Sequence, residues 1–278
     1  MEKKWFYEKM SPETVYGYHV TSVHEENTGF QELQIVDHGH FGRMMILDNV
    51  VQTTEKDEFV YHEMMTHLPI MALARPAESI LIIGGGDGGI LQECLRHDSV
   101  KRVTMVDIDG RVIEVSKEML FFKDAFKDPR LELIVGDGAA YVAGEEAQNK
   151  KFDVVIVDSP DPVGPAMVLF EAPFYKNISK CLNEDGIMVR QAGVPVFQAP
   201  ELKEAVEHVQ LSFPHVAVYR GVVPVYGGDM AFVIASKNGA PVDQPNGQFT
   251  GKYYHTRFHS AAFVLPAFWY DVTGLPME

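Results

Sequence analysis

The sequence has few cysteines, no long hydrophobic run and a deficit of positive charge. Its 278 residues include two cysteines, Cys94 and Cys181, which are too few for a disulfide scaffold or a four-cysteine zinc site. No apolar stretch approaches the roughly 18 residues that cross a bilayer, and no secretory signal follows Met1. We therefore expect a cytoplasmic protein with no membrane partner.

The charge balance is strongly acidic, with 24 Lys and Arg against 39 Asp and Glu and a net charge of −15. This excess disfavours nonspecific binding to nucleic acid or anionic membranes. It is compatible with a cationic substrate, and equally with a need for solubility alone. Since 46% of the residues are hydrophobic, the chain can bury a core large enough for one α/β domain and a smaller unit.

The most informative stretch is an aliphatic run that leads into a glycine cluster, from Ser79 to Gly89. The run is typical of a strand buried on both faces of a parallel sheet. Gly84, Gly86 and Gly89 satisfy the G-x-G-x-x-G nucleotide-binding fingerprint. The fingerprint also occurs in ordinary tight turns, but its place between a predicted strand and a predicted helix favours a nucleoside-type ligand.

Residues 1–60 have the strand period of two, and we expect them to form a small N-terminal antiparallel β domain. The predicted strands lie at Tyr18–Val23, Gln31–Val36 and Arg43–Leu47. Because so small a sheet is marginally stable alone, we expect it to pack on the main domain or on a partner subunit.

Residues 61–278 alternate between strand and helix patterns, which predicts a Rossmann-like, methyltransferase-type doubly wound α/β sheet that is mostly parallel. A helix over Phe59–Leu68 should end before Pro69. The segment Lys237–Gly251 reads as a flexible loop. The predicted strands are Ile80–Ile83, Arg102–Val106, Leu131–Val135, Phe152–Val157, Gly186–Gln191, Val216–Tyr219 and Phe232–Ala235. The predicted helices are Ile90–His97, Arg111–Met119, Pro173–Leu182 and Pro200–Leu211.

An acidic residue follows each of four predicted strands. These residues are Asp87, Asp107, Asp137 and Asp158. In open α/β sheets the ligand binds beyond the carboxyl ends of the strands, where an acid such as Asp107 can bind both ribose hydroxyls. The alternative is helix N-capping, which explains a single Asp109 or Asp161 equally well. For four acids in one row, capping is the weaker explanation.

Asp87 lies inside the glycine loop, where its charge would repel a phosphate. A dinucleotide is therefore the least favoured ligand. The position favours a nucleoside without phosphates that carries positive charge. S-adenosyl compounds meet both conditions, since they contain a ribose, an adenine and a sulfonium.

A zinc-binding helix is one possible interpretation of His62, Glu63 and His67, and their spacing argues against it. Metal-binding histidines on a helix are four residues apart, whereas these are five apart and diverge by about 140°. We expect no metal site here. On this reasoning alone, an ordinary polar position on the helix and a functional role explain His62 equally well.

Several long motifs occur in order along nearly the whole chain. They are LDNVVQTTEKDEFVYHEM at 47–64, IIGGGDGG at 82–89, VDID at 106–109, GDG at 136–138, VDSPDPVGP at 157–165, YY at 253–254 and AAFVLP at 261–266. In these motifs the chain resembles the polyamine aminopropyltransferases, most closely the bacterial spermidine synthases. The resemblance implies a transferase of polyamine biosynthesis that is a homodimer or homotetramer.

The implied reaction transfers an aminopropyl group from decarboxylated S-adenosylmethionine to a diamine, usually putrescine, giving spermidine and 5′-methylthioadenosine. The sulfonium nucleoside is a co-substrate, so the resemblance implies no cofactor and no metal. It implies that Asp158 is the catalytic proton acceptor. The implied nucleoside contacts are Gln31, Gly84, Gly86, Asp107, Asp137, Gly138 and Pro165. The implied amine contacts are Tyr61, His62, Asp87, Ser159, Asp161 and Tyr226.

Some alternatives stay open. The loop at 160–166 can be a moving lid or a rigid turn. Val225 stands where the family usually has threonine, and the segment 191–197 lacks a tryptophan that many members have. Both departures leave the acceptor open among putrescine, cadaverine, agmatine and spermidine. A methyltransferase that uses intact S-adenosylmethionine is the runner-up, and a non-catalytic polyamine-binding protein is a third possibility.

Overall fold

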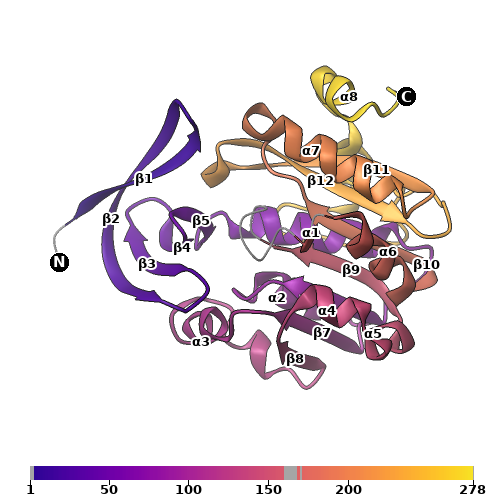
Figure 1. Cartoon of the computed structure of the whole chain (residues 1–278), viewed down its shortest axis with the longest axis horizontal. Coiled ribbons are helices and arrows are strands. Elements are labelled where there is room, and N and C mark those ends of the chain that lie inside the picture. The colour runs from indigo at the N-terminus through magenta and orange to yellow at the C-terminus, as the bar shows by residue number, and fades with distance from the viewer. Residues whose placement is uncertain (1–2, 160–167, 170, 278) are drawn as a thin grey trace.

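The structure, a computed structural model, describes residues 3–159, 168–169 and 171–277. Its N-terminal part is a five-stranded antiparallel sheet whose strands neighbour one another in chain order. The strands are β1 (Lys4–Ser11), β2 (Thr14–Asn27), β3 (Glu32–His38), β4 (Gly42–Leu47) and β5 (Val50–Thr54). Figure 1 shows this sheet at one end of the molecule, with β1 and β2 forming a hairpin that projects from it. The predicted N-terminal β unit is confirmed, with β1 and β5 as strands that the sequence did not predict.

The main sheet has seven strands in the order β11-β12-β10-β9-β6-β7-β8. They are β6 (Ser79–Gly84), β7 (Arg102–Asp107), β8 (Leu131–Val135), β9 (Phe152–Asp158), β10 (Leu182–Gln191), β11 (His215–Val223) and β12 (Gly228–Ser236). Strands β6 to β10 pair in parallel, whereas β12 runs antiparallel to both of its neighbours. A turn of a few residues joins β11 to β12, and such a short connection permits only antiparallel pairing. The predicted mostly parallel, Rossmann-like α/β sheet is confirmed.

Helices cover both faces of the main sheet. They are α1 (Glu58–Ala72), α2 (Gly89–Leu95), α3 (Gly110–Met119), α4 (Gly138–Ala143), α5 (Glu145–Lys150), α6 (Ala172–Cys181), α7 (Pro195–Gln210) and α8 (Ala267–Thr273). Within β6, Ile80 and Ile82 belong to the core that includes α1 and α2, while Leu81 and Ile83 belong to the core that includes α6 and α7. This strand is therefore apolar on both faces, as its uninterrupted aliphatic run predicts.

The expectation that the first long helix ends before Pro69 is wrong. Helix α1 continues through Pro69 to Ala72. A proline inside a helix loses one backbone hydrogen bond and crowds the preceding turn. Here Leu68, Ile70 and Met71 are buried, and burying them favours the last turn by more than the proline disfavours it. Helix α7 also contains a proline, Pro200, and begins earlier than predicted, through a kink at Gln198.

A third core joins the N-terminal sheet to α3. It contains Leu33, Ile35 and Met45 from the sheet and Val112 and Val115 from the helix. Figure 1 shows α3 beside β3. The small sheet thus packs on the main domain, one of the two arrangements that its size predicts. The proposed domain boundary near residue 60 falls within α1.

The segment 237–251 has no helix or named strand, as predicted, but it is attached to α1 and its neighbours. The Asn246 amide donates a hydrogen bond to the Met71 carbonyl over 2.7 Å. The Phe249 ring packs on the imidazoles of His67 and His97. Among the described residues, no helix is long and apolar enough to cross a membrane.

The turn after β6 requires glycine at position 84, which offers a test of the fold. Gly84 has φ of +85°, and an added Cβ would lie 1.8 Å from the Asp158 carbonyl oxygen. Gly29 has φ of +95° but open space around it. We expect Gly29→Ala to cost about 1–2 kcal/mol of backbone strain. Gly84→Ala should cost about 3 kcal/mol or more, because the clash with backbone adds to the strain.

Urea unfolding of both variants measures these costs. Because both positions have positive φ, the difference between them isolates the clash with the end of β9. Equal destabilisation would show that β6 and β9 need no such close approach.

Candidate active site

A cavity of about 390 Å³ lies at the carboxyl ends of the central strands, between the main sheet and the N-terminal sheet. Its lining includes all four strand-end acids, Asp87, Asp107, Asp137 and Asp158. Because parallel strands end at one edge of the sheet, the row of acids that the sequence predicts becomes one side of a single cavity.

The other predicted site residues that the structure describes also line this cavity. They are Gln31, Tyr61, His62, Gly84, Gly86, Gly138, Ser159 and Tyr226. Asp161 and Pro165 lie outside the described residues, as does the whole segment 160–166. The structure thus brings together residues from the N-terminal sheet, α1, the glycine loop and three strand ends.

Asp158 ends β9 and is hydrogen-bonded to helix α1. The Tyr61 hydroxyl donates to Asp158 Oδ1 over 2.5 Å. Burial and the neighbouring Asp87 carboxylate raise the pKa of Asp158 to about 7, although Tyr61 and His62 act in the opposite direction. A carboxylate with this pKa can accept a proton near neutral pH, which an exposed aspartate does poorly.

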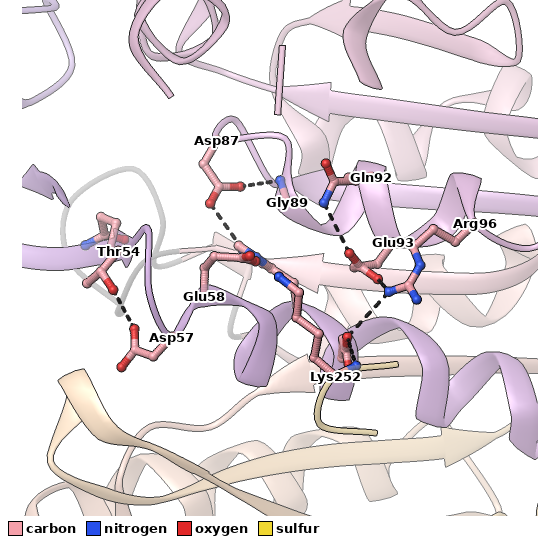
Figure 2. Close-up of polar contacts among 12 residues, drawn as sticks. Thr54, Asp57, Glu58, Asp87, Gly89, Gln92, Glu93, Arg96 and Lys252 are labelled. Atoms are coloured by element: carbon pink, nitrogen blue, oxygen red, sulfur yellow. Dashed lines mark hydrogen bonds and ion pairs between the residues drawn. The ribbon is translucent and has the colours of Figure 1, made fainter. Parts of the chain in front are cut away.

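His62 lies between two buried carboxylates. Its Nδ1 is 2.7 Å from Glu58 Oε2, and its Nε2 is 3.1 Å from Asp87 Oδ2. The Gly89 amide donates to the other Asp87 oxygen, Oδ1, over 2.9 Å. Figure 2 shows Glu58, Asp87 and Gly89 grouped around this point. Both ring nitrogens of His62 therefore face acids. Each oxygen of the Asp87 carboxylate has a partner, His62 for Oδ2 and the Gly89 amide for Oδ1.

Asp107 ends β7 on the side of the glycine loop. The Asp109 amide donates to Asp107 Oδ1 over 2.8 Å. Burial raises the pKa of Asp107 to about 6, and the nearby charges of Asp109 and Asp87 contribute. The contact with Asp109 holds the Asp107 carboxyl at the cavity wall.

Helix capping explains two of the acids that follow strands. Asp109 Oδ1 accepts from the first amides of α3, and Asp137 Oδ1 accepts from Ala139 and Ala140 at the start of α4. The capping alternative thus applies to Asp137 as well as to Asp109. Both capping bonds of Asp137 go to one oxygen, so capping and a place in the cavity wall are compatible.

The capping residue Asp109 also contacts the N-terminal sheet. Its Oδ2 accepts from the Gln31 side-chain amide over 3.0 Å and from the Thr28 hydroxyl over 2.6 Å. These contacts place Gln31 at the same edge of the cavity as Asp107.

The loop between β11 and β12 carries Tyr226 and is fixed by Asp57. The Val225 amide donates to Asp57 Oδ2 over 2.8 Å, and the Tyr18 hydroxyl donates to the Val225 carbonyl over 2.9 Å. The Tyr226 hydroxyl donates to the Gln52 carbonyl of β5. The Tyr226 ring meets the Tyr61 ring edge to face, with centroids 6.0 Å apart. The loop thus meets β2, β5 and the start of α1 at this wall.

Sequence reasoning missed several residues that line the cavity. They include Glu8, Met10, Val50, Gln52, Gln191, Phe197 and Gln198. Glu8 is 5% exposed and lies on the face of β1 that also buries Phe6. An acid on the apolar face of an alternating strand is a recognisable signal, but β1 itself was not predicted. Gln191 could have been found as the polar end of a buried strand.

One buried group among the described residues has the composition of a metal site. Ligand atoms of Glu63, His67 and Glu93 lie within 4.8 Å of one another. The Arg96 guanidinium contacts both glutamates, as Figure 2 shows for Glu93. Glu63 also accepts backbone amides of 252–254. These partners stabilise the two carboxylates, and His62 and His67 face different partners, as their five-residue spacing predicts.

A second hollow, of about 510 Å³, lies at the opposite ends of the strands. Several of its charged side chains are already paired: Arg75 with Asp153 and Asp185, and Lys150 with Glu132 and Glu146 beside the hollow. The acid-lined cavity therefore remains the candidate active site.

Comparison with known proteins identifies the family. A family profile described as "Spermine/spermidine synthase domain" matches residues 58–245. A second, described as "Spermidine synthase tetramerisation domain", matches residues 4–55.

Curated relatives cover most of the chain. A polyamine aminopropyltransferase of Bacillus mycoides is 45% identical over 89% of this chain and 90% of the relative. One from Bacillus subtilis is 43% identical over 98% of this chain and 99% of the relative. Polyamine aminopropyltransferase 1 of Pseudomonas aeruginosa is 43% identical over 91% of each.

Two solved structures have the same fold over nearly the whole chain. A spermidine synthase crystallised with the transition-state analogue AdoDATO has a TM-score of 0.92 at 32% identity, covering 98% of this chain and 96% of that one. The spermidine synthase of Thermotoga maritima has a TM-score of 0.91 at 32% identity, covering 99% and 96%. This chain therefore belongs to the spermine/spermidine synthase family of polyamine aminopropyltransferases.

Proposed function

We propose that the protein transfers an aminopropyl group from decarboxylated S-adenosylmethionine to putrescine, with Asp158 as the general base, giving spermidine and 5′-methylthioadenosine. The observation that carries the proposal is a buried carboxyl with a raised pKa in the same cavity as the glycine loop. The structural neighbour that binds AdoDATO supports a sulfonium-type nucleoside as the donor.

The base is needed because an alkyl amine is protonated at neutral pH. Like the lysine side chain, it has a pKa near 10, and its protonated form has no lone pair for attack. Asp158 accepts that proton while the nitrogen attacks the methylene carbon next to the sulfonium. A positioned base contributes about 10²–10⁴-fold to the rate. The sulfur leaves as a neutral thioether, so the proposed reaction uses the nucleoside as co-substrate without a further cofactor or metal.

The cavity suits two cationic reactants. Asp87 and Asp158 repel each other when both are ionised, and bound cations relieve that repulsion. Glu8 adds a carboxylate on the wall formed by the N-terminal sheet, which suits a diamine with a charge at each end.

The proposed roles divide the site residues between the two substrates, the nucleoside donor and the amine acceptor. The nucleoside contacts are Gln31, Gly84, Gly86, Asp107, Asp137, Gly138 and Pro165. The groups on the amine side are Tyr61, His62, Asp87, Ser159, Asp161 and Tyr226.

We also propose a homodimer or homotetramer in the cytoplasm. Trp5 and Tyr7, both 59% exposed, stack on the outer face of β1, and the matching tetramerisation profile covers this strand. Exposed aromatic patches are typical of interfaces. The buried free thiols of Cys94 and Cys181 fit a reducing compartment.

The assembly is tested by replacing the aromatic pair. We expect the Trp5→Ala, Tyr7→Ala double variant to shift from an oligomer to a smaller species in light scattering after size-exclusion chromatography. Phe268→Ala, which removes an exposed ring on α8, serves as the control. An unchanged mass in the double variant would exclude β1 from the interface.

The reaction is tested by product analysis. We expect decarboxylated S-adenosylmethionine and putrescine to give spermidine and methylthioadenosine, measured by mass spectrometry with cadaverine, agmatine and spermidine as competing acceptors. Methylated amine formed from intact S-adenosylmethionine would instead identify a methyltransferase. Absence of methylthioadenosine with every amine would support a binding protein.

Asp158→Asn should lose activity and gain stability. We expect turnover to fall by about 10²–10⁴-fold while nucleoside binding persists. At pH 8 the ionised, buried Asp158 carries a penalty that asparagine lacks, so the melting temperature should rise. Because the penalty requires ionisation, the gain should vanish as the pH falls below 7 towards the ordinary pKa of 3.8.

Asp153→Asn is the matched control on the same strand. Asp153 is buried and paired with Arg75, so this variant should lose stability and retain its chemistry. Near-normal turnover of Asp158→Asn would rule out the proposed base.

A further inference from the structure

We infer that Glu58 is a positioning residue for the proposed reaction: it holds His62 as a cation, and this cation orients Asp87 and favours the ionised form of Asp158. The inference rests on the proposed function and deepens it, because Glu58 is no part of the cavity lining and acts through His62.

The geometry forms a continuous chain of three buried side chains. The side chains of Glu58, His62 and Asp87 are 8%, 3% and 9% exposed. Glu58 and His62 are four residues apart on α1, which places them on one face of the helix. Asp87 comes from the glycine loop on the opposite side of the ring. A neutral imidazole has one N–H, so it could donate to only one of the two carboxylates.

The His62 ring is closely packed on two further sides. The Phe122 ring meets it edge to face, with centroids 5.3 Å apart. On another side lies Gly89, where an added Cβ would be 2.1–2.4 Å from the ring atoms. The imidazole is therefore packed between an aromatic edge and backbone, and its two nitrogens point at the two acids.

The charge of His62 follows from its partners. Burial alone would lower the pKa of the imidazole, but the Asp87 and Glu58 carboxylates raise it well above the usual range. His62 in turn lowers the pKa of Asp158, on which Asp87, Asp107 and Tyr61 also act. A lasting imidazolium thus offsets the repulsion between Asp87 and Asp158 before any substrate binds.

Glu58→Gln tests the inference, since glutamine keeps the shape of the side chain and removes its charge. We expect the pKa of His62 to fall, because the Glu58 carboxylate is one of the two groups that raise it. The acid limb of the pH profile of kcat/KM should move to higher pH, because Asp158 and Asp87 lose their cation. For an acid limb that lies near pH 7, a shift of about one unit corresponds to about a fivefold loss of kcat/KM at pH 7. At pH 9 most of the loss should disappear, since Asp158 then ionises without help.

Glu63→Gln is the matched control. Glu63 is a buried acid on the same helix, but it pairs with Arg96 and with the backbone of 252–254. Its loss should lower the melting temperature and leave the shape of the pH profile unchanged. An equal loss at pH 7 and pH 9 in Glu58→Gln would show a merely structural role and overturn the inference.

Nitrogen NMR of ¹⁵N-histidine-labelled protein separates this inference from the proposed reaction. With His62→Gln used for assignment, we expect the His62 ring to remain doubly protonated at pH 8 in the parent and not in Glu58→Gln. A neutral His62 in the parent would overturn the inference even if aminopropyl transfer occurs. A charged His62 in a protein without this activity would instead contradict the proposed function.

Discussion

Ionised carboxylates that are buried together repel one another, and this repulsion is the constraint on which the cavity depends. The chain places Asp87, Asp107 and Asp158 at neighbouring strand ends, where burial raises the pKa of Asp107 and Asp158. Such a cluster persists because its members are held by other groups: the Tyr61 hydroxyl, the His62 ring and backbone amides. What remains of the repulsion favours the binding of cations. The same feature that disfavours the empty site therefore makes it suitable for a sulfonium and an ammonium.

The N-terminal sheet completes this site instead of forming a separate unit. Its apolar face packs on α3, while Gln31 is hydrogen-bonded to the capping residue Asp109. Glu8 and Gln52 line the cavity from the same sheet. A sheet of this size gains stability from the contact, and the cavity gains a second wall that the strand ends of a Rossmann-like sheet alone do not provide.

Much of the fold could be predicted, because periodicity and composition report local burial. The aliphatic run at Ile80–Ile83 indicated a central strand, and the acids after four strands indicated one edge of the sheet. The errors have physical causes. Pro69 disfavours a helix locally, but buried neighbours carry α1 past it. Strand β1 was not predicted. Phe6 and Glu8 share its inner face, and the acid interrupts the apolar pattern by which a strand is recognised. The proposed roles of the site residues go beyond both periodicity and geometry and stay predictions.

The sequence by itself determined the elements, the glycine turn and the row of acids, because these depend on neighbours within a few residues along the chain. Only the tertiary structure decided which charges meet. The family motif marked His62 as an amine contact, but only the structure showed that the glycine loop brings Asp87 to its second nitrogen, opposite Glu58. Glu8 and Gln191 likewise reach the cavity through contacts between distant segments. Ionisation depends on distances and burial in three dimensions, and local sequence patterns do not specify these.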